Sequence, residues 1–157
     1  MINYKPVSFY TNKNDTSIFD VGIVMYKDSE GVIILSVLKD GSYDNTQYIK
    51  NDCIYLCEYD DFYCNEMSKK ISTHNLDKHV IDFKTGIDSK NQVIEFCMKE
   101  ILIVSIELLP SGNVDVYGII EEINNDFIRV KKFDDADNED GKAVVRIENI
   151  TRISFEK

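Results

Sequence analysis

The stretch that decides the fold is residues 114–130, which read VDVYGIIEEINNDFIRV. Residues 114–123 and 127–130 are rich in β-branched side chains, which favour strands. Asn124-Asn125-Asp126 between them is typical of a tight turn. The stretch therefore predicts two consecutive strands.

Similar apolar runs lie on both sides of this stretch. They predict further strands at 101–109, 144–147 and 150–155, and nearer the N-terminus at 19–24, 32–38, 47–50 and 53–58. Residues 110–113 contain Pro and Gly and are expected to turn. Short strands with turn signals about every 8–12 residues favour a small barrel or a sandwich.

Two segments between the strand-rich regions have helical spacing instead. Residues 61–71 and 89–100 each place apolar side chains on one helical face. Ser89, with Gln92 three positions on, matches a capping box and predicts the start of the second helix. Residues 72–88 are polar and predict no clear element beyond a short strand at 80–83.

The strand-rich regions repeat one another. Gly22-Ile23-Val24 aligns with Gly118-Ile119-Ile120, and polar loops follow at 39–45 and 134–141. The repeat predicts a first β unit, a helical connector and a second β unit, with the boundaries 1–60, 61–100 and 101–157.

The repeat resembles a known family. Residues 104–130 resemble the first motif of Sm and Sm-like proteins, and 145–155 resemble the second. Gly118, and Gly22 in the first copy, stand where such proteins bend a strand. The resemblance implies a mainly β (α+β) fold of two small Sm-like or SH3-like barrels joined by short helical segments.

Charge disfavours the RNA binding that the resemblance would bring with it. The 157 residues carry 18 Lys and Arg against 28 Asp and Glu, a net charge of −10. Such a chain is a poor match for phosphate. Glu148-Asn149 also stands where Sm-like RNA sites place an arginine-glycine pair.

The four cysteines are Cys53, Cys57, Cys64 and Cys97. Their spacing lacks a C-x2-C or C-x4-C knuckle, and the chain shows no export signal or apolar run long enough to span a membrane. Buried free thiols in a reducing cytoplasm are the favoured interpretation, with a disulfide or a metal site as alternatives.

Candidate binding residues fall in loops. Asp134, Asp135 and Asp137 belong to an acidic loop that fails the EF-hand spacing, so a solvated, flexible loop is expected, with weak adventitious cation binding as the alternative. Tyr43 is the most exposed candidate of a tyrosine-rich stretch, because it is predicted in a loop. A core role for these tyrosines is the alternative.

Signals of catalysis are weak. The chain has no nucleophile elbow and no Gly-rich phosphate loop, and His74 and His79 lie in a polar stretch. No catalytic, cofactor or metal residue is predicted. The expected function is a non-enzymatic protein-binding module for a basic partner, such as an inhibitor or a toxin-neutralising protein. The alternatives are an Sm-like RNA-binding protein and a homo-oligomer built through open strand edges.

Overall fold

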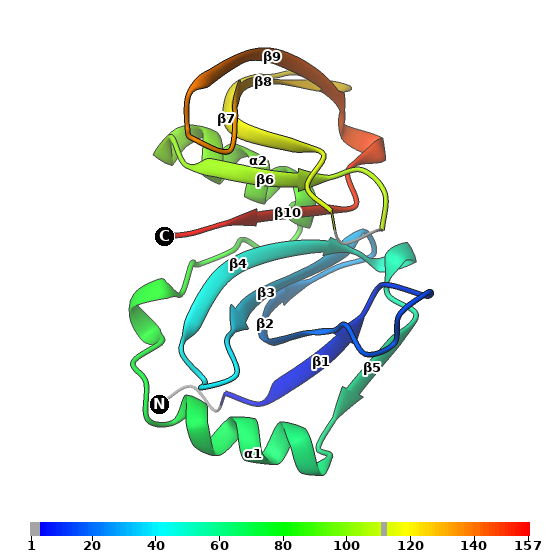
Figure 1. Cartoon of the computed structure of the whole chain (residues 1–157), viewed down its shortest axis with the longest axis vertical. Helices are drawn as coiled ribbons and strands as arrows, with labels where there is room; N and C mark the ends of the chain where they lie inside the picture. Colours follow the sequence, from blue (N-terminus) through cyan, green and yellow to red (C-terminus); the bar gives the residue numbers. More distant parts are fainter. Residues whose placement is uncertain (1–3, 111–112) are drawn as a thin grey trace.

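The computed structural model describes residues 4–110 and 113–157. Its strands form one antiparallel ten-stranded sheet in the order β5-β1-β2-β3-β4-β10-β6-β7-β8-β9 (Figure 1). Strands β1 to β5 form the lower part of the view, and β10 lies between β4 and β6. The predicted turn at 110–113 includes residues 111 and 112, which lie outside the described residues.

The elements have the following bounds. The strands are β1 (Pro6–Tyr10), β2 (Asp20–Lys27), β3 (Gly31–Val37), β4 (Tyr43–Lys50), β5 (Leu56–Tyr59), β6 (Ile103–Glu107), β7 (Val116–Ile123), β8 (Phe127–Phe133), β9 (Glu139–Arg146) and β10 (Arg152–Phe155). The helices are α1 (Phe62–Ile71) and α2 (Ser89–Glu100), with 3-10 turns η1 (Asn51–Cys53), η2 (Asp77–His79) and η3 (Ile147–Asn149). Among the described residues, no helix is long and apolar enough to cross a bilayer.

The predicted repeat is confirmed in the strand pairing. A shift of 96 residues carries Gly22 to Gly118, and carries its partner Ser36 to Lys132. The same shift maps the register of β3–β4 onto that of β8–β9, and maps η1 onto η3. Even the bulges recur, at Val24/Tyr26 and Ile120/Glu122. The chain therefore contains two copies of one five-stranded unit.

The predicted pair of Sm-like or SH3-like barrels is wrong, although the mainly β (α+β) composition is confirmed. The outer edge of β4 pairs with β10 of the second unit, from Arg152↔Ile49 to Phe155↔Thr46. That edge is therefore unavailable to close the first unit on itself. The two units merge into one open sheet, and the structure gives no support to the family resemblance.

Both helices pack on one side of β3, and each helix is amphipathic as expected. Met67 and Ile71 of α1 pack against Leu35 and Val37 of β3. Helix α2 covers the β4–β10 junction, where Val93, Ile94 and Cys97 join one cluster with Tyr48, Ile153 and Phe155. On the opposite side of β3, Val32 and Ile34 pack with Phe9 and Ile49. This double cover explains why β3 is buried at every position.

The helix starts differ in part from prediction. Asp61 caps α1 by accepting a hydrogen bond from the Cys64 amide at 2.7 Å. The capping box at Ser89 is wrong, because Asp88 caps α2 through the Asn91 amide at 2.8 Å. Gln92 instead bonds the loop before the helix, at the Lys84 amide.

The segment before α2 holds no strand at 80–83, contrary to prediction. The structure shows the 3-10 turn η2 followed by an irregular chain. Leu76 and Ile81 are buried there, so two apolar side chains anchor the otherwise polar segment 72–88.

The two repeated glycines lie where strands approach closely. A Cβ on Gly118 would overlap the backbone carbonyl of Lys131 on the paired strand. A Cβ on Gly22 would lie 2.9 Å from the Ile34 Cδ1 and 3.0 Å from the Leu35 carbonyl oxygen. Both positions need glycine for close packing between strands.

One arginine ties the two units together at the β4–β10 junction. Arg152 Nη1 donates to Asp20 Oδ2 at 2.6 Å and to Gln47 Oε1 at 3.0 Å. Its Nη2 donates to Thr11 Oγ1 at 2.8 Å, and its Nε lies 3.4 Å from Glu107 Oε2. The guanidinium therefore neutralises Glu107, whose side chain is buried.

Candidate functional site

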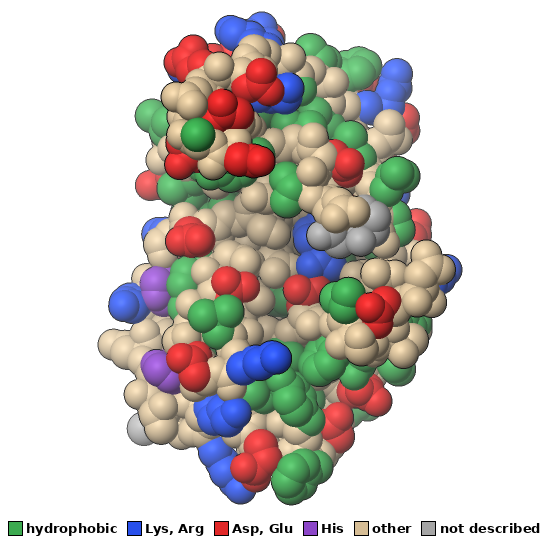
Figure 2. Space-filling model, in the orientation of Figure 1, with side chains coloured by type: hydrophobic (Ala, Val, Ile, Leu, Met, Phe, Trp, Pro, Cys, Tyr) green, Lys and Arg blue, Asp and Glu red, His purple; other side chains and the backbone are tan. Residues whose placement is uncertain are grey.

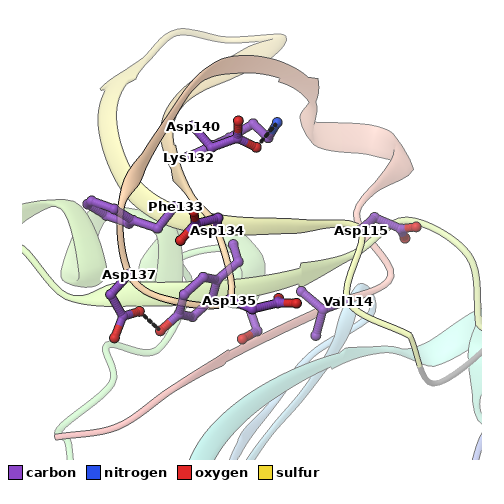
Figure 3. A pocket seen from close by; sticks show the side chains of 10 residues that line it. Val114, Asp115, Lys132, Phe133, Asp134, Asp135, Asp137 and Asp140 are labelled. Atoms are coloured by element: carbon purple, nitrogen blue, oxygen red, sulfur yellow. Dashed lines mark hydrogen bonds and ion pairs between the residues drawn. The ribbon is translucent and has the colours of Figure 1, made fainter.

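A hollow with a volume of about 700 Å³ lies beside the β8–β9 turn. We call it the acidic hollow (Figure 3). Five of the ten lining residues are aspartates. The lining consists of Ser105, Val114, Asp115, Tyr117, Lys132, Phe133, Asp134, Asp135, Asp137 and Asp140. In Figure 2, acidic side chains gather at the upper left, over this turn.

Asp134 holds the turn itself. Its Oδ1 accepts the amides of Ala136 and Asn138, both at 2.9 Å. The backbone hydrogen bond from Asn138, followed by that from Ala136, holds the pKa of the Asp134 carboxyl below its usual range. This carboxylate shapes the turn, as an aspartate commonly does through bonds to its own backbone.

A tyrosine holds the side chain of Asp137 in place. The Tyr117 hydroxyl donates to Asp137 Oδ1 at 3.1 Å (Figure 3). Burial, followed by this hydrogen bond, raises the pKa of Tyr117. Asp137 also adopts a left-handed backbone with φ of 60°. Its carboxylate is therefore oriented into the hollow by the turn and by Tyr117.

The remaining three aspartates differ in their partners. Asp140 lies 3.3 Å from Lys132 Nζ. Asp115 Oδ2 accepts the Leu108 amide at 2.7 Å. Asp135 is exposed and makes no hydrogen bond or ion pair within the described residues. One lysine thus faces five aspartates, and Asp135 is the carboxylate available to a ligand.

A second hollow of about 390 Å³ adjoins the first, and Ser105 and Tyr117 line both. Asn45 and Glu156 also line it. The Asn45 Oδ1 is buried and has no hydrogen-bond partner among the described residues. Burial, followed by the charges of Glu156 and Asp20, raises the pKa of the neighbouring Asp44. The two hollows together present acceptors and negative charge, which suit a cationic hydrogen-bond donor.

Tyr43 does not lie in a loop as predicted. It is the first residue of β4 and is half-buried. Its ring stacks on His79 with centroids 3.7 Å apart. Its hydroxyl accepts the Lys157 amide at 3.3 Å. These contacts fix the end of the chain, and Tyr43 does not line the acidic hollow.

The tyrosine-rich stretch divides between core and surface. Tyr48 is fully buried, while Tyr59 is 69% and Phe62 83% exposed. The exposed members lie on β5 and at the start of α1, at one edge of the sheet.

The basic residues of β8 are paired. Arg129 lies 2.6 Å from Glu122 and 3.4 Å from Glu121. Lys131 forms an ion pair with Glu139, as Lys132 does with Asp140. These pairs cancel the charge that a phosphate backbone would need.

The cysteines and histidines are the other residue types that could bind a metal. No group of three or more His, Cys, Asp or Glu residues in the described part of the chain could hold a metal ion. All four cysteines are free, with Cys64 and Cys97 buried and Cys57 exposed. Cys57 therefore departs from the prediction of buried thiols. His74 bonds the Asp40 carbonyl oxygen through Nε2, at 3.2 Å.

Sequence reasoning missed the part of the site that β7 supplies. Asp115 directly precedes β7 and Tyr117 lies near its start, and both reach the hollow because β7 pairs with β8. The repeat indicated that β7 would contribute to the site, since its register places residue 118 beside residue 132.

No protein-family model, curated protein or solved structure matches this chain.

Proposed function

We propose that this protein is a non-enzymatic binding module that holds a basic protein partner in the acidic hollow. The observation that carries the proposal is the five aspartates gathered around one hollow with a single lysine. Asp135, which has no partner in the described structure, is the primary contact for a lysine or arginine of the partner.

Long-range attraction supports the same proposal. A net charge of −10 raises the encounter rate with a cationic protein, and the hollow then orients its side chain. An inhibitor or a toxin-neutralising protein works in this way, by masking the basic site of another protein. The free and partly exposed thiols are in keeping with a reducing cytoplasm.

The experiment measures binding of a fluorescent oligoarginine peptide by anisotropy at several salt concentrations. Asp135→Asn together with Asp140→Asn should weaken binding by about thirtyfold or more, since each removes one charge-assisted contact worth about 1 kcal/mol or more. Rising salt should weaken binding by the wild type more than by this variant.

Asp126→Asn together with Asp52→Asn is the matched control, because both carboxylates are exposed and neither lines the acidic hollow. It removes the same two charges and should bind like the wild type. Equal losses in both variants would show a net-charge effect and sink the proposed site. Tighter binding of a single-stranded RNA than of the peptide would favour the alternative, an RNA-binding protein.

A further inference from the structure

The sheet ends in two strands that each pair on one side only within the described chain. Strand β5 pairs with β1, and β9 pairs with β8. The opposite edges of β5 and β9 lie at the two ends of the strand order. Such edges carry unpaired amides and carbonyls, which can bind a further strand.

The repeat supplies a template for what fits these edges. The 96-residue shift carries β4 onto β9, and carries β5 onto β10. Inside the chain, β4 and β10 pair with each other. The free edge of β9 is therefore the counterpart of the β4 edge that binds β10. The free edge of β5 is likewise the counterpart of the β10 edge that binds β4.

The side chains agree with this template. At the internal junction Ile153 lies opposite Tyr48, and both are fully buried. Their counterparts are Cys57 on β5 and Val144 on β9, which are apolar and exposed, Val144 to 68%. Phe155 is buried, and its counterpart Tyr59 is 69% exposed. Apolar side chains thus lie exposed where the internal junction covers them, as at a surface that meets a partner.

We propose that copies of this chain associate head to tail, with β9 of one copy adding antiparallel to β5 of the next. The internal register, shifted by 96 residues, pairs Leu56 with Val145, Cys57 with Val144, Glu58 with Ala143 and Tyr59 with Lys142. Because the two surfaces differ, each copy can bind on both sides, and the assembly grows as a ring or as an open chain.

The register makes a cross-link the sharpest test. Directly opposed residues in antiparallel strands lie about 4.5–5.5 Å apart between Cα atoms, within reach of a disulfide. Val144→Cys should therefore form an intermolecular disulfide with Cys57 under mild oxidation and give a ladder of sizes on a non-reducing gel. Cys57→Ser in the same background should abolish the ladder.

Ala143→Cys is the matched control, since neighbouring side chains on a strand point to opposite faces. It should cross-link far less than Val144→Cys. Cross-linking of both to the same extent, or of neither, would overturn the register and with it the proposal.

The mass in solution tests the assembly without a cross-link. In analytical ultracentrifugation, wild-type protein should have a mass above the 18.1 kDa of the monomer. The mass should rise further at high salt, because salt screens the repulsion between copies that each carry a net charge of −10. Val144→Lys and Cys57→Lys should each weaken association by about tenfold or more and should yield monomers with unchanged circular dichroism. Mixed together they should form a two-chain complex, because each retains the edge that the other has lost.

A wild-type monomer at every concentration would refute the proposal, as would an assembly that both variants leave intact. High salt weakens the peptide binding proposed for the acidic hollow, so the two proposals respond to salt in opposite directions and fail separately.

Discussion

The two five-stranded units share one register and differ in what covers them. Strand β3 is buried at all of its seven positions, whereas its counterpart β8 is fully buried only at Ile128 and Val130. Helix α1 packs on the first unit, whereas α2 packs on both units, against β3 and β4 of the first and against β7 of the second. The difference teaches that the order of strands within one unit follows from the local sequence pattern, while burial also depends on the helices, which lie outside the repeated segments.

The largest expected effect comes from equivalent residues in the two units. Tyr48 is fully buried against α2, while Val144, 96 positions later, is 68% exposed. Tyr48→Ala should lower the free energy of unfolding by about 3–5 kcal/mol, as for other large core side chains. Val144→Ala should change it by about 0.5 kcal/mol or less.

Urea unfolding at low protein concentration, where chains are monomeric, measures the unfolding free energy of both variants. Equal losses of unfolding free energy in the two variants would contradict the comparison, because packing by α2 would then not explain the greater importance of Tyr48.

A second effect concerns the junction. Arg152 is the counterpart of the exposed Leu56, yet it faces Asp20 and the buried Glu107. Arg152→Ala should cost about 3 kcal/mol, because a buried carboxylate loses its cation. Leu56→Ala should cost less than about 1 kcal/mol. In urea unfolding, recovery of stability in the double variant Arg152→Ala with Glu107→Gln would confirm that the loss comes from removing the Arg152 cation beside the buried Glu107 carboxylate.

A smaller effect distinguishes the turns between β2 and β3 and between β7 and β8. Asp28 accepts the amides of Glu30 and Gly31 at 2.9 and 3.0 Å. Its counterpart Asn124 accepts those of Asp126 and Phe127 at 3.0 and 2.9 Å. The geometry is the same, but only the aspartate titrates.

Burial alone would raise the pKa of the Asp28 carboxyl, but hydrogen bonds from Gly31, Ser89 and Glu30 hold it below its usual range. A lowered carboxyl pKa adds stability above the unfolded value of about 3.9, and that stability is lost as the pH falls through the folded value. Asp28→Asn should therefore flatten the fall in stability below about pH 5, as measured by urea unfolding at a series of pH values. Asp126→Asn serves as the control, and an unchanged slope in Asp28→Asn would contradict the assignment.

The repeat and both helices could be predicted because their signals are local. Alternating β-branched residues around Gly22 and Gly118 are spaced as the strands are, and the apolar faces of α1 and α2 recur at helical spacing. The β4–β10 junction could not be predicted, because it joins Thr46 to Phe155 across most of the chain. Barrel closure was expected from the pattern of one unit alone. That pattern does not show that the edge of β4 pairs with a strand of the other unit.

The sequence predicted which loop residues belong to the candidate site, but it did not predict what each of them does. Asp134 and Asp137 were grouped with Asp135 as loop carboxylates, but the first holds the turn and the second is bonded to Tyr117. Likewise, Ser89 and Asp88 both suit a helix start, and the choice depends on Asp28, which accepts the Ser89 hydroxyl at 2.8 Å. Such roles depend on neighbours that are distant in the sequence.

The smallest expected effect concerns the backbone conformation of two equivalent turns, β3–β4 and β8–β9. Asp137 has φ of 60°, and its counterpart Gly41 has φ of 86°. A left-handed conformation costs a non-glycine residue about 1 kcal/mol. Asp137→Gly should therefore be more stable than Asp137→Ala by about that amount in urea unfolding, since both lack the carboxylate and differ only in backbone freedom.

The same change in the first unit should act more strongly, because a Cβ on Gly41 would lie 2.7 Å from the backbone of α1. Gly41→Ala should then cost more than the difference between the two Asp137 variants. Equal effects at both turns would mean that the helix contact adds nothing to the requirement for glycine. Asp137→Gly retains Asp135, so any loss of peptide binding in this variant measures the contribution of the Asp137 carboxylate to the acidic hollow.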